Sequence, residues 1–375
     1  MKYYLVAGEP SGDLHGSNLI NHLKKLDKHA DFRGLGGDLM EKAGAKLSVH
    51  YKKMSFIGII EVLKNLKKIN RTLEYCRQDI NNYKPDALIL IDYPGFNLRF
   101  AGRVRPLQVP VVYYISPQLW AWGRGRVNKI RRLVDRMLVV FPFEVDFYQR
   151  FGIMARYVGH PLVDTHYRAV KPKDKVIPGD AVLGLMPGSR QQELDQLLPG
   201  MLQAVDILRR GNQIDRVVIA AVDHLDDTVY RKFIGDRQGI EIYRGPLAEF
   251  YNSLDAAVVK SGTATLETAY FQVPLVIVYR VNRLTWFLGK RMVKLDFIGL
   301  ANIVAGEKIA TELLQDDFTA ERAASEVSRL LAPDTNRTMR QKLRIIQDRL
   351  GEPGASERAA EEIERFVKEH ENEHA

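Results

Sequence analysis

The sequence is poor in the features that mark secreted, membrane-spanning or cysteine-rich proteins. It has one cysteine, Cys76, among 375 residues, so it can form neither an internal disulfide nor a cysteine-based metal site. No apolar run approaches the roughly 18 residues that a transmembrane helix needs. The segment Met1 to Gly8 is apolar but too short for a signal peptide. We therefore expect a protein of the reducing cytoplasm.

The chain also lacks the signatures of several binding modules. It has no fixed-period repeat, no low-complexity tract and no GxGxxG loop of the dinucleotide-binding type. Lys and Arg number 55 against 46 Asp and Glu, a formal net charge of +9, which favours an anionic partner: nucleic acid, acidic lipid or a phosphorylated substrate. The positive charges are dispersed, without the aromatic and basic platform of RNA-binding domains. We therefore expect no nucleic-acid partner.

What the sequence does contain is a strand-and-helix pattern that occurs twice. Apolar runs typical of buried parallel strands end in glycine-bearing loops, after which helical spacing begins. A polar segment with Lys and Pro, from Arg168 to Gly179, separates the two series. The length allows two or three domains, each able to bury its own core. We predict an α/β fold with two Rossmann-like domains facing a cleft, where ligands would bind.

The stretch from Ala256 to Glu267, AAVVKSGTATLE, is typical of a buried strand that leads into a helix. At a helix N-terminus, unpaired N–H groups and the helix dipole attract anions, so Ser261, Gly262 and Thr263 would donate to a phosphate. About one turn further, Glu267 could accept hydrogen bonds from sugar hydroxyls, as acidic residues do in dinucleotide sites. A nucleotide-sugar is the ligand that this suggests. An ordinary strand-turn-helix, capped by Thr263, is the alternative.

A second loop of the same kind is Pro187-Gly188-Ser189-Arg190, between a strand and a long helix. Arg190 could stabilise the negative charge that builds on a leaving phosphate. A surface Arg beside a helix cap is the alternative. No DxD-type metal motif lies next to either loop. We therefore expect catalysis to rest on helix dipoles and Arg190, with no metal ion and no cofactor.

Carboxylates follow two strands in the first half of the chain. Asp92 comes directly after the buried run ALILI, at the sheet edge where α/β proteins bind ligands. A rigid strand would hold it there as a general base, although it could equally cap the next helix. The loop GEPSGD holds Glu9 and Asp13. Either could face a sugar, but a helix cap by Ser11 or Asp13 explains this loop more simply.

A third feature is the helical pattern from Met54 to Leu73, which has one ordinary apolar face. Two further apolar residues, Ile57 and Ile60, lie on the opposite face among cations. These cations include Lys64, Lys67 and Lys68. Apolar side chains among Lys residues are typical of a helix that rests on an anionic bilayer. The alternative is that Ile57 and Ile60 pack against another part of the protein.

Taken together, these segments resemble the lipid-A-disaccharide synthase family, whose fold is of the GT-B glycosyltransferase type. Each segment is weak alone, but they occur in order along nearly the whole chain. The matching segments are GEPSGD (8–13), FIGIIEVL (56–63), IDYPGFN (91–97), YISPQLWAW (114–122), GHP (159–161), PGSR (187–190), KSGTATLE (260–267) and ANIVAG (301–306).

The resemblance implies an inverting transferase that moves 2,3-diacylglucosamine from UDP to 2,3-diacylglucosamine 1-phosphate and releases UDP. By position, Asp92 would be the base and Arg190 would contact the diphosphate. The nucleotide-sugar site would be lined by Glu9, Ser189, Glu267 and Asn302. In the family a second Asp usually stands where this chain has Gly95, which puts a paired carboxylate in doubt.

The resemblance also implies that the two domains bind different substrates. Residues 1–168, completed by helices of 345–375, would hold the acceptor and the base, and residues 169–344 would hold the nucleotide-sugar. The protein would associate peripherally with the cytoplasmic face of the inner membrane. The alternatives are a UDP-sugar epimerase of the same fold and a nonenzymatic anion-binding module. The sequence leaves open the acyl-chain lengths and the oligomeric state, for which a homodimer is one option.

Overall fold

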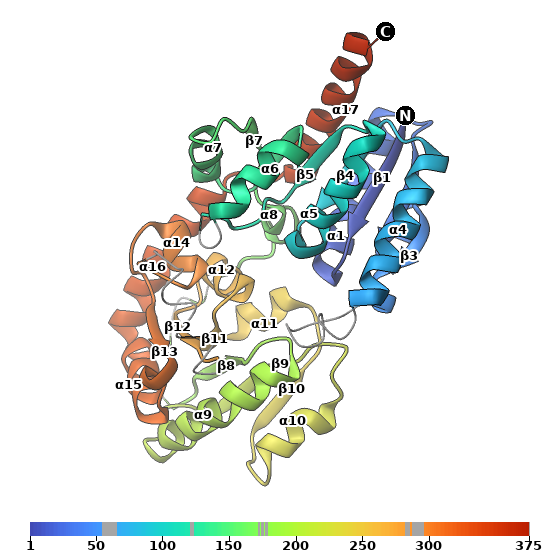
Figure 1. The fold of residues 1–375 in the computed structure, drawn as a ribbon. Coiled ribbons are helices and arrows are strands. Elements are labelled where there is room, and N and C mark those ends of the chain that lie inside the picture. The colour runs from blue at the N-terminus through green and yellow to red at the C-terminus, as the bar shows by residue number, and fades with distance from the viewer. Residues whose placement is uncertain are drawn as a thin grey trace. The chain divides into compact units, whose positions relative to one another are not determined.

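The computed structural model describes residues 1–54, 66–120, 124–171, 173, 176, 179–281, 286 and 296–374. The chain forms two compact units, each with one parallel sheet (Figure 1). Unit 1 is Met1–Thr165 with Gly351–Ala375, and unit 2 is His166–Leu350. We predicted these boundaries after residues 168 and 344, whereas residues 166–168 and 345–350 belong to unit 2. The prediction of an α/β fold with two Rossmann-like parallel sheets is confirmed.

The sheet of unit 1 has seven parallel strands in the order β3-β2-β1-β4-β5-β6-β7. The strands are β1 (Lys2–Ala7), β2 (Asp31–Gly36), β3 (Lys46–His50), β4 (Ala87–Ile91), β5 (Val111–Tyr114), β6 (Arg136–Val139) and β7 (Ala155–Tyr157). From β1 the chain first builds outward through β2 and β3 and then returns to the other side of β1 with β4. The crevice at the carboxyl ends of β1 and β4 is therefore the topological switch point, where open α/β sheets bind ligands.

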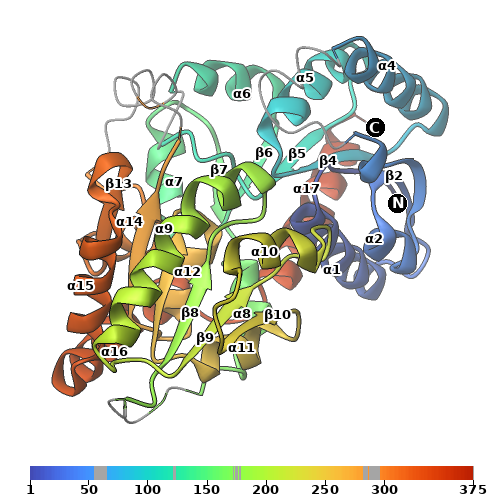
Figure 2. The same ribbon diagram turned by 90° about the horizontal axis from the view of Figure 1, so that it is seen from below.

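Helices cover both faces of this sheet because alternate side chains of each strand point to opposite faces. On one face, Tyr4, Val6 and Leu90 pack in a core with α4 (Leu66–Tyr83), α5 (Pro94–Val104), α6 (Val127–Leu133) and α7 (Pro142–Gln149). On the other face, Leu5 and Ile91 pack in a core with α1 (Pro10–Leu26), α2 (Asp38–Lys42) and α17 (Ala355–His374). Figure 2 shows α4, α5 and α6 along one side of the sheet. The remaining helical segments are η1 (Tyr51–Met54), η2 (Arg105–Leu107), η3 (Arg124–Arg126) and α8 (Pro161–His166).

The C-terminal helix α17 belongs to unit 1 although it follows unit 2 in the chain. Its apolar residues Ala359, Ile363 and Val367 are buried in the sheet core. The carboxylate of Asp164 accepts hydrogen bonds from the N–H groups of Gly354 (2.7 Å), Ala355 (2.9 Å) and Ser356 (2.9 Å). These N–H groups have no partner inside the helix, so Asp164 caps α17 at the point where the chain re-enters unit 1.

The sheet of unit 2 has six parallel strands in the order β10-β9-β8-β11-β12-β13. They are β8 (Val182–Met186), β9 (Arg216–Ala220), β10 (Ile240–Tyr243), β11 (Ala256–Lys260), β12 (Leu275–Tyr279) and β13 (Thr311–Leu314). The helices are α9 (Gln191–Arg210), α10 (Asp227–Ile234), α11 (Leu247–Ser253), α12 (Thr263–Tyr270), α14 (Leu300–Ala305), α15 (Ala320–Leu331) and α16 (Pro333–Leu350), with η4 at Gln315–Asp317. Here the order reverses between β8 and β11. The loops PGSR and KSGT, which follow these two strands, therefore flank the switch point of unit 2.

The helix predicted from Met54 to Leu73 is described only from Leu66, where α4 begins. Ile69 and Leu73 of its apolar face are buried. Ile57, Ile60 and Lys64 lie outside the described residues. Among the helices of the described ranges, none is both long enough and apolar enough to span a bilayer.

Candidate functional site

Asp92 stands at the carboxyl end of β4 with an unusual backbone. Asp92 and Tyr93 both have a φ of +45°, the left-handed region that residues with a Cβ rarely adopt. The carbonyl oxygen of Asp92 accepts hydrogen bonds from the Tyr113 hydroxyl (2.6 Å) and from Asn97 Nδ2 (2.7 Å), and its N–H donates to the Tyr114 carbonyl (3.1 Å). Such strain persists only where the surroundings fix it, and it is commonest at functional sites. The backbone therefore holds Asp92 rigidly at the switch point.

The carboxyl group of Asp92 is a stronger base than an exposed one. Its pKa is raised from 3.8 to about 6, chiefly by burial and also by the negative charge of Glu9, while the N–H of Tyr93 acts in the opposite direction. A carboxylate with a pKa of about 6 is still largely ionised at neutral pH, yet it accepts a proton more readily than one with the usual pKa. The position and the pKa of Asp92 both suit a general base.

Glu9 lies at the N-cap of α1, two residues after the end of β1, and its side chain makes no capping hydrogen bond. A Cβ on Gly8 would come within 2.2 Å of Tyr93 Cδ1, so glycine is required for this loop to lie against Tyr93. The loops after β1 and β4 thus meet at the switch point. Asp13 is buried and accepts from the N–H groups of Gly37, Leu39 and Met40, which caps α2. Of the two acids in the loop, only Glu9 is placed to face a ligand.

A buried carboxylate that we did not predict, Glu144 of α7, organises the loop after β5. It accepts hydrogen bonds from Ser116 Oγ (2.6 Å), Trp120 Nε1 (2.9 Å) and the N–H groups of Val140 (3.2 Å) and Phe141 (3.1 Å). Complete burial raises its pKa to about 7, although all four hydrogen bonds act in the opposite direction. Glu144 therefore positions the segment SPQLW at the carboxyl edge, beside the strand that carries Asp92.

In unit 2 a second unpredicted acid, Glu193 of α9, joins the two glycine-bearing loops. Its carboxylate accepts a hydrogen bond from the N–H of Ser189 (2.9 Å) and pairs with Lys260 Nζ (2.9 Å). The guanidinium of Arg190 is farther away, at 3.7 Å from Glu193 Oε1, and its side chain is 48% exposed. His224 contacts the Ser189 carbonyl (2.8 Å). Arg190 thus stands at the α9 N-cap with donors left for a ligand.

The KSGT loop offers fewer phosphate donors than we expected. The N–H of Ser261 donates to the Val278 carbonyl (2.9 Å) and its hydroxyl to the Ile298 carbonyl (3.1 Å), so both Ser261 donors are used within unit 2. Gly262 has a φ of +155° and lies at the N-cap of α12. Thr263 is exposed in the first turn, where N–H groups have no partner inside the helix. The available donors are therefore those of Gly262 and Thr263.

Glu267 and Asn302 differ in their access to a ligand. Glu267 Oε2 accepts a hydrogen bond from the Tyr251 hydroxyl (3.0 Å), and burial raises its pKa. Its other oxygen can still accept from a sugar hydroxyl. Asn302 is fully buried. Its amide nitrogen donates to the Ala310 carbonyl and the Glu312 carboxylate, and its amide oxygen accepts from the Ala310 N–H. In this geometry Asn302 ties α14 to β13 and does not face a ligand, which differs from the role that the resemblance implied.

The other predicted site residues have few contacts that indicate a role. Ser189 presents its backbone to Glu193 and His224, as described above. Lys67 and Lys68 are exposed on the first turn of α4, and the other predicted membrane contacts lie outside the described residues. Within the described ranges, no group of three or more His, Cys, Asp or Glu side chains is placed to hold a metal ion.

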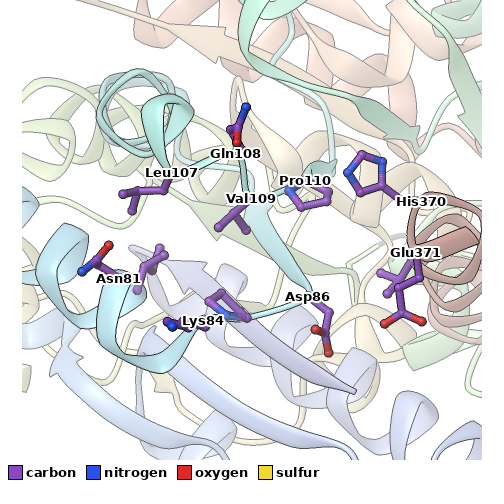
Figure 3. A pocket seen from close by; sticks show the side chains of 12 residues that line it. Asn81, Lys84, Asp86, Leu107, Gln108, Val109, Pro110, His370 and Glu371 are labelled. Carbon is purple, nitrogen blue, oxygen red and sulfur yellow. The ribbon is translucent and has the colours of Figure 1, made fainter. Parts of the chain in front are cut away.

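A pocket of about 470 Å³ lies in unit 1, away from Asp92 (Figure 3). Its wall includes Asp86 and Pro110, which immediately precede β4 and β5, and His370 and Glu371 of α17. Because the strands are parallel, this is the amino edge of the sheet, opposite the carboxyl edge at which Asp92 stands. The pocket is therefore separate from the candidate site.

Comparisons with known proteins show the family to which the chain belongs. The family model described as "Lipid-A-disaccharide synthetase" matches residues 3–364. A lipid-A-disaccharide synthase of Geobacter sulfurreducens is 42% identical over 364 residues, 95% of this chain and 94% of the relative. The synthase of Myxococcus xanthus is 41% identical over 369 residues, 96% of each chain.

Solved structures share the fold at low sequence identity. The UDP-GlcNAc 2-epimerase of Neisseria meningitidis has a TM-score of 0.66 at 10% identity and covers 97% of this chain and 100% of its own. The calicheamicin glycosyltransferase CalG4 has a TM-score of 0.61 at 15% identity, with 98% of both chains covered. The fold is thus of the GT-B type and is shared with epimerases, whereas the sequence relatives do not favour the epimerase alternative. On the family model and these relatives, the chain belongs to the lipid-A-disaccharide synthase family.

Proposed function

We propose that this UDP-dependent glycosyltransferase of lipid A biosynthesis uses Asp92 as its general base. The acceptor in this proposal is 2,3-diacylglucosamine 1-phosphate, and the donor is UDP-2,3-diacylglucosamine. The observation that carries the proposal is the placement of Asp92, which is held rigidly and half-buried at the switch point of unit 1 and has a pKa of about 6. Unit 1 would hold the acceptor and unit 2 the nucleotide-sugar.

In the proposed reaction, Asp92 activates the acceptor hydroxyl for attack on the donor sugar. Asp92 takes the proton of the acceptor hydroxyl as that oxygen forms a bond to the anomeric carbon of the donor. The bond between this carbon and the diphosphate breaks on the opposite side, so the configuration inverts and the electron pair leaves with UDP. Glu9, beside Asp92, would accept hydrogen bonds from the substrate.

The groups of unit 2 would stabilise the departing UDP. Arg190 and the first-turn N–H groups of Gly262 and Thr263 face the charge that develops on the diphosphate. Glu193 would position Arg190 and Lys260 by linking the two loops. Glu267 would accept hydrogen bonds from the ribose hydroxyls. Asn302 would act indirectly, through the packing of α14.

We also propose peripheral contact with the cytoplasmic face of the inner membrane. The support is the sequence pattern around Ile57, Ile60 and Lys64, together with the exposure of Lys67 and Lys68. Changing Ile57 and Ile60 to Ser should lower sedimentation with anionic liposomes and leave UDP affinity and the melting temperature nearly unchanged. A double variant that melts early but still binds liposomes as before would show that the two residues are core.

The direct test of the reaction is incubation of the protein with both diacylglucosamine substrates, followed by mass spectrometry. We expect a disaccharide 1-phosphate and one UDP per disaccharide. Neither product should form when the acceptor is omitted. Conversion of the UDP-sugar to an isomer of equal mass, without any disaccharide, would contradict the proposal and favour an epimerase.

A further inference from the structure

A group of positively charged side chains lies on the outer side of α5 and α6 in unit 1. The two helices follow the adjacent strands β4 and β5, cover the same sheet face and lie close together (Figure 2). A Cβ on Gly102 would be 3.8 Å from Leu133 Cδ1, which places the middle of α5 against the end of α6. Cations on their outer sides can therefore converge.

Three arginine side chains lie near Lys129. Arg126, Lys129 and Arg132 recur every third residue along α6 and its start, so they form one stripe. Arg99 joins them from α5. Burial lowers the pKa of Lys129, and the charges of Arg99, Arg126 and Arg132 lower it further, which places all three within electrostatic reach of it. We call these four residues the cation cluster.

The cation cluster lacks acidic partners of the kind that two nearby cations, Arg103 and Arg105, have. Arg103 of α5 pairs with Glu74 (3.7 Å), and Arg105 pairs with Asp135 (2.9 Å). Within the described ranges, no carboxylate forms an ion pair with a member of the cation cluster. Like charges that crowd a half-buried Lys are unfavourable unless an anion binds among them. The arrangement is therefore typical of an anion-binding site.

The position of the cation cluster connects it to Asp92. Helix α5 begins at Pro94, two residues after Asp92, and Arg99 lies about 7.5 Å along the helix from that start. Arg126 directly precedes α6, which also starts from the carboxyl edge of the sheet. A ligand that reaches from Asp92 along the outer side of α5 would thus meet the cluster.

We propose that Arg99, Arg126, Lys129 and Arg132 bind the phosphate monoester of the acceptor sugar. The proposal rests on the proposed function, in which Asp92 deprotonates a hydroxyl of that same sugar. Guanidinium and ammonium groups suit a dianionic phosphate, which each can bind with charge-assisted hydrogen bonds. A phospholipid headgroup has the same chemistry, but a bilayer contact also needs apolar side chains. Among the described residues of α5 and α6, no large apolar side chain is exposed.

The test compares the variant Arg99→Gln/Lys129→Gln with the control Arg131→Gln, which removes an exposed cation of α6 outside the cluster. We expect the double variant to bind glucosamine 1-phosphate at least roughly tenfold more weakly in a ³¹P NMR titration. In transfer assays the KM for the acceptor should rise by a similar factor, while the KM for the UDP-sugar and the melting temperature stay unchanged. The control should behave as the unchanged protein does.

Two outcomes would overturn the proposal. One is unchanged binding of glucosamine 1-phosphate by the double variant. The other is an unchanged acceptor KM with reduced sedimentation on anionic phosphatidylglycerol vesicles, which would assign the cluster to the bilayer. If the unchanged protein makes no disaccharide, the proposed function fails, but the ³¹P titration still decides whether the cluster binds a sugar phosphate.

Discussion

At the residue scale, two consecutive left-handed residues with side chains are held in place at one strand end. Tyr113 and Asn97 both donate to the carbonyl of Asp92, so the strain at Asp92 and Tyr93 is sustained by groups on β5 and α5. The cost of such a conformation is of the order of 1–3 kcal/mol per residue. An ordinary turn would avoid this cost. The catalytic role that we propose for Asp92 would explain why the strained conformation is kept.

The raised pKa of Asp92 predicts an acid limb in the rate profile. Because the carboxylate must be ionised to take a proton, kcat/KM should fall as the pH decreases through about 6. An unperturbed Asp would lose activity only near pH 4. A pH profile of kcat/KM for UDP-sugar and acceptor checks this. A rate that stays constant down to pH 5 would contradict the assignment.

The same shift predicts a pH-dependent effect of Asp92→Asn on stability. The folded state binds the Asp92 proton more tightly than the unfolded state, so the contribution of this group to stability is lost as the pH rises from about 4 to 6. Asparagine removes that loss. The variant should therefore melt at a higher temperature than the unchanged protein at pH 7, and the difference should shrink at pH 4. A constant difference across this range would mean that Asp92 has an ordinary pKa.

Arg190 should act mainly on the chemical step. Its side chain is exposed and only distantly paired with Glu193, so Arg190→Ala should leave the fold intact. If its charge matters chiefly as the bond to the diphosphate breaks, kcat should fall more than the affinity for the UDP-sugar. Steady-state kinetics with calorimetric UDP binding separates the two effects. Loss of binding alone would make Arg190 a simple anchor.

At the scale of elements, each sheet has its candidate groups at the point where the strand order reverses. In unit 1 these are the loops after β1 and β4, and in unit 2 the loops after β8 and β11. The four strands were predictable because buried parallel strands are continuous apolar runs, and the loops because glycine and small polar residues interrupt them. The strand order itself followed from no local pattern in the sequence.

The residues that we missed join segments far apart in the chain. Glu144 accepts hydrogen bonds from Ser116 and Trp120 of a preceding loop, and Glu193 of α9 pairs with Lys260 at the end of β11. No periodicity or spacing connects such partners before the fold brings them together. Conversely, Ser261 and Asn302 fit the motif in sequence, but the fold uses their polar groups internally. The fold therefore uses within unit 2 two side chains that the sequence pattern alone left available for a ligand.

The link through Glu193 gives a prediction at this scale. Glu193→Ala removes the acceptor of the Ser189 N–H and the partner of Lys260, so both loops should lose their fixed positions. We expect the affinity for UDP to fall roughly tenfold, which corresponds to about 1.4 kcal/mol. Calorimetry with UDP measures this, and Glu241→Ala, which breaks an exposed pair with Arg216, is the control. Unchanged UDP affinity would mean that the loops are positioned without Glu193.

At the scale of the whole molecule, the chain leaves unit 1 at Thr165 and returns to it at Gly351. Asp164 lies beside the first crossing and caps α17 just after the second. One carboxylate thus ties together the two ends of the connection in unit 1. The resemblance implied that C-terminal helices complete the first domain, but the capping residue was not predictable, because it lies far from α17 in the chain.

Asp164→Ala should therefore destabilise unit 1. Three N–H groups at the start of α17 would lose their acceptor, and loss of a helix cap costs about 1–2 kcal/mol. Urea denaturation followed by circular dichroism checks the expected decrease in the free energy of unfolding, and Asp164→Asn, which keeps one acceptor oxygen, should recover part of it. An Ala variant as stable as the unchanged protein would show that α17 is held by its apolar face alone.

The most direct test of the central claim is the turnover of Asp92→Asn, with UDP binding measured on the same preparation. Asparagine keeps the size of the side chain but cannot take the proton of the acceptor. We predict folded protein with UDP affinity retained and disaccharide formation reduced roughly 10²-fold or more. Near-normal disaccharide formation by Asp92→Asn would remove Asp92 from the mechanism and contradict the account.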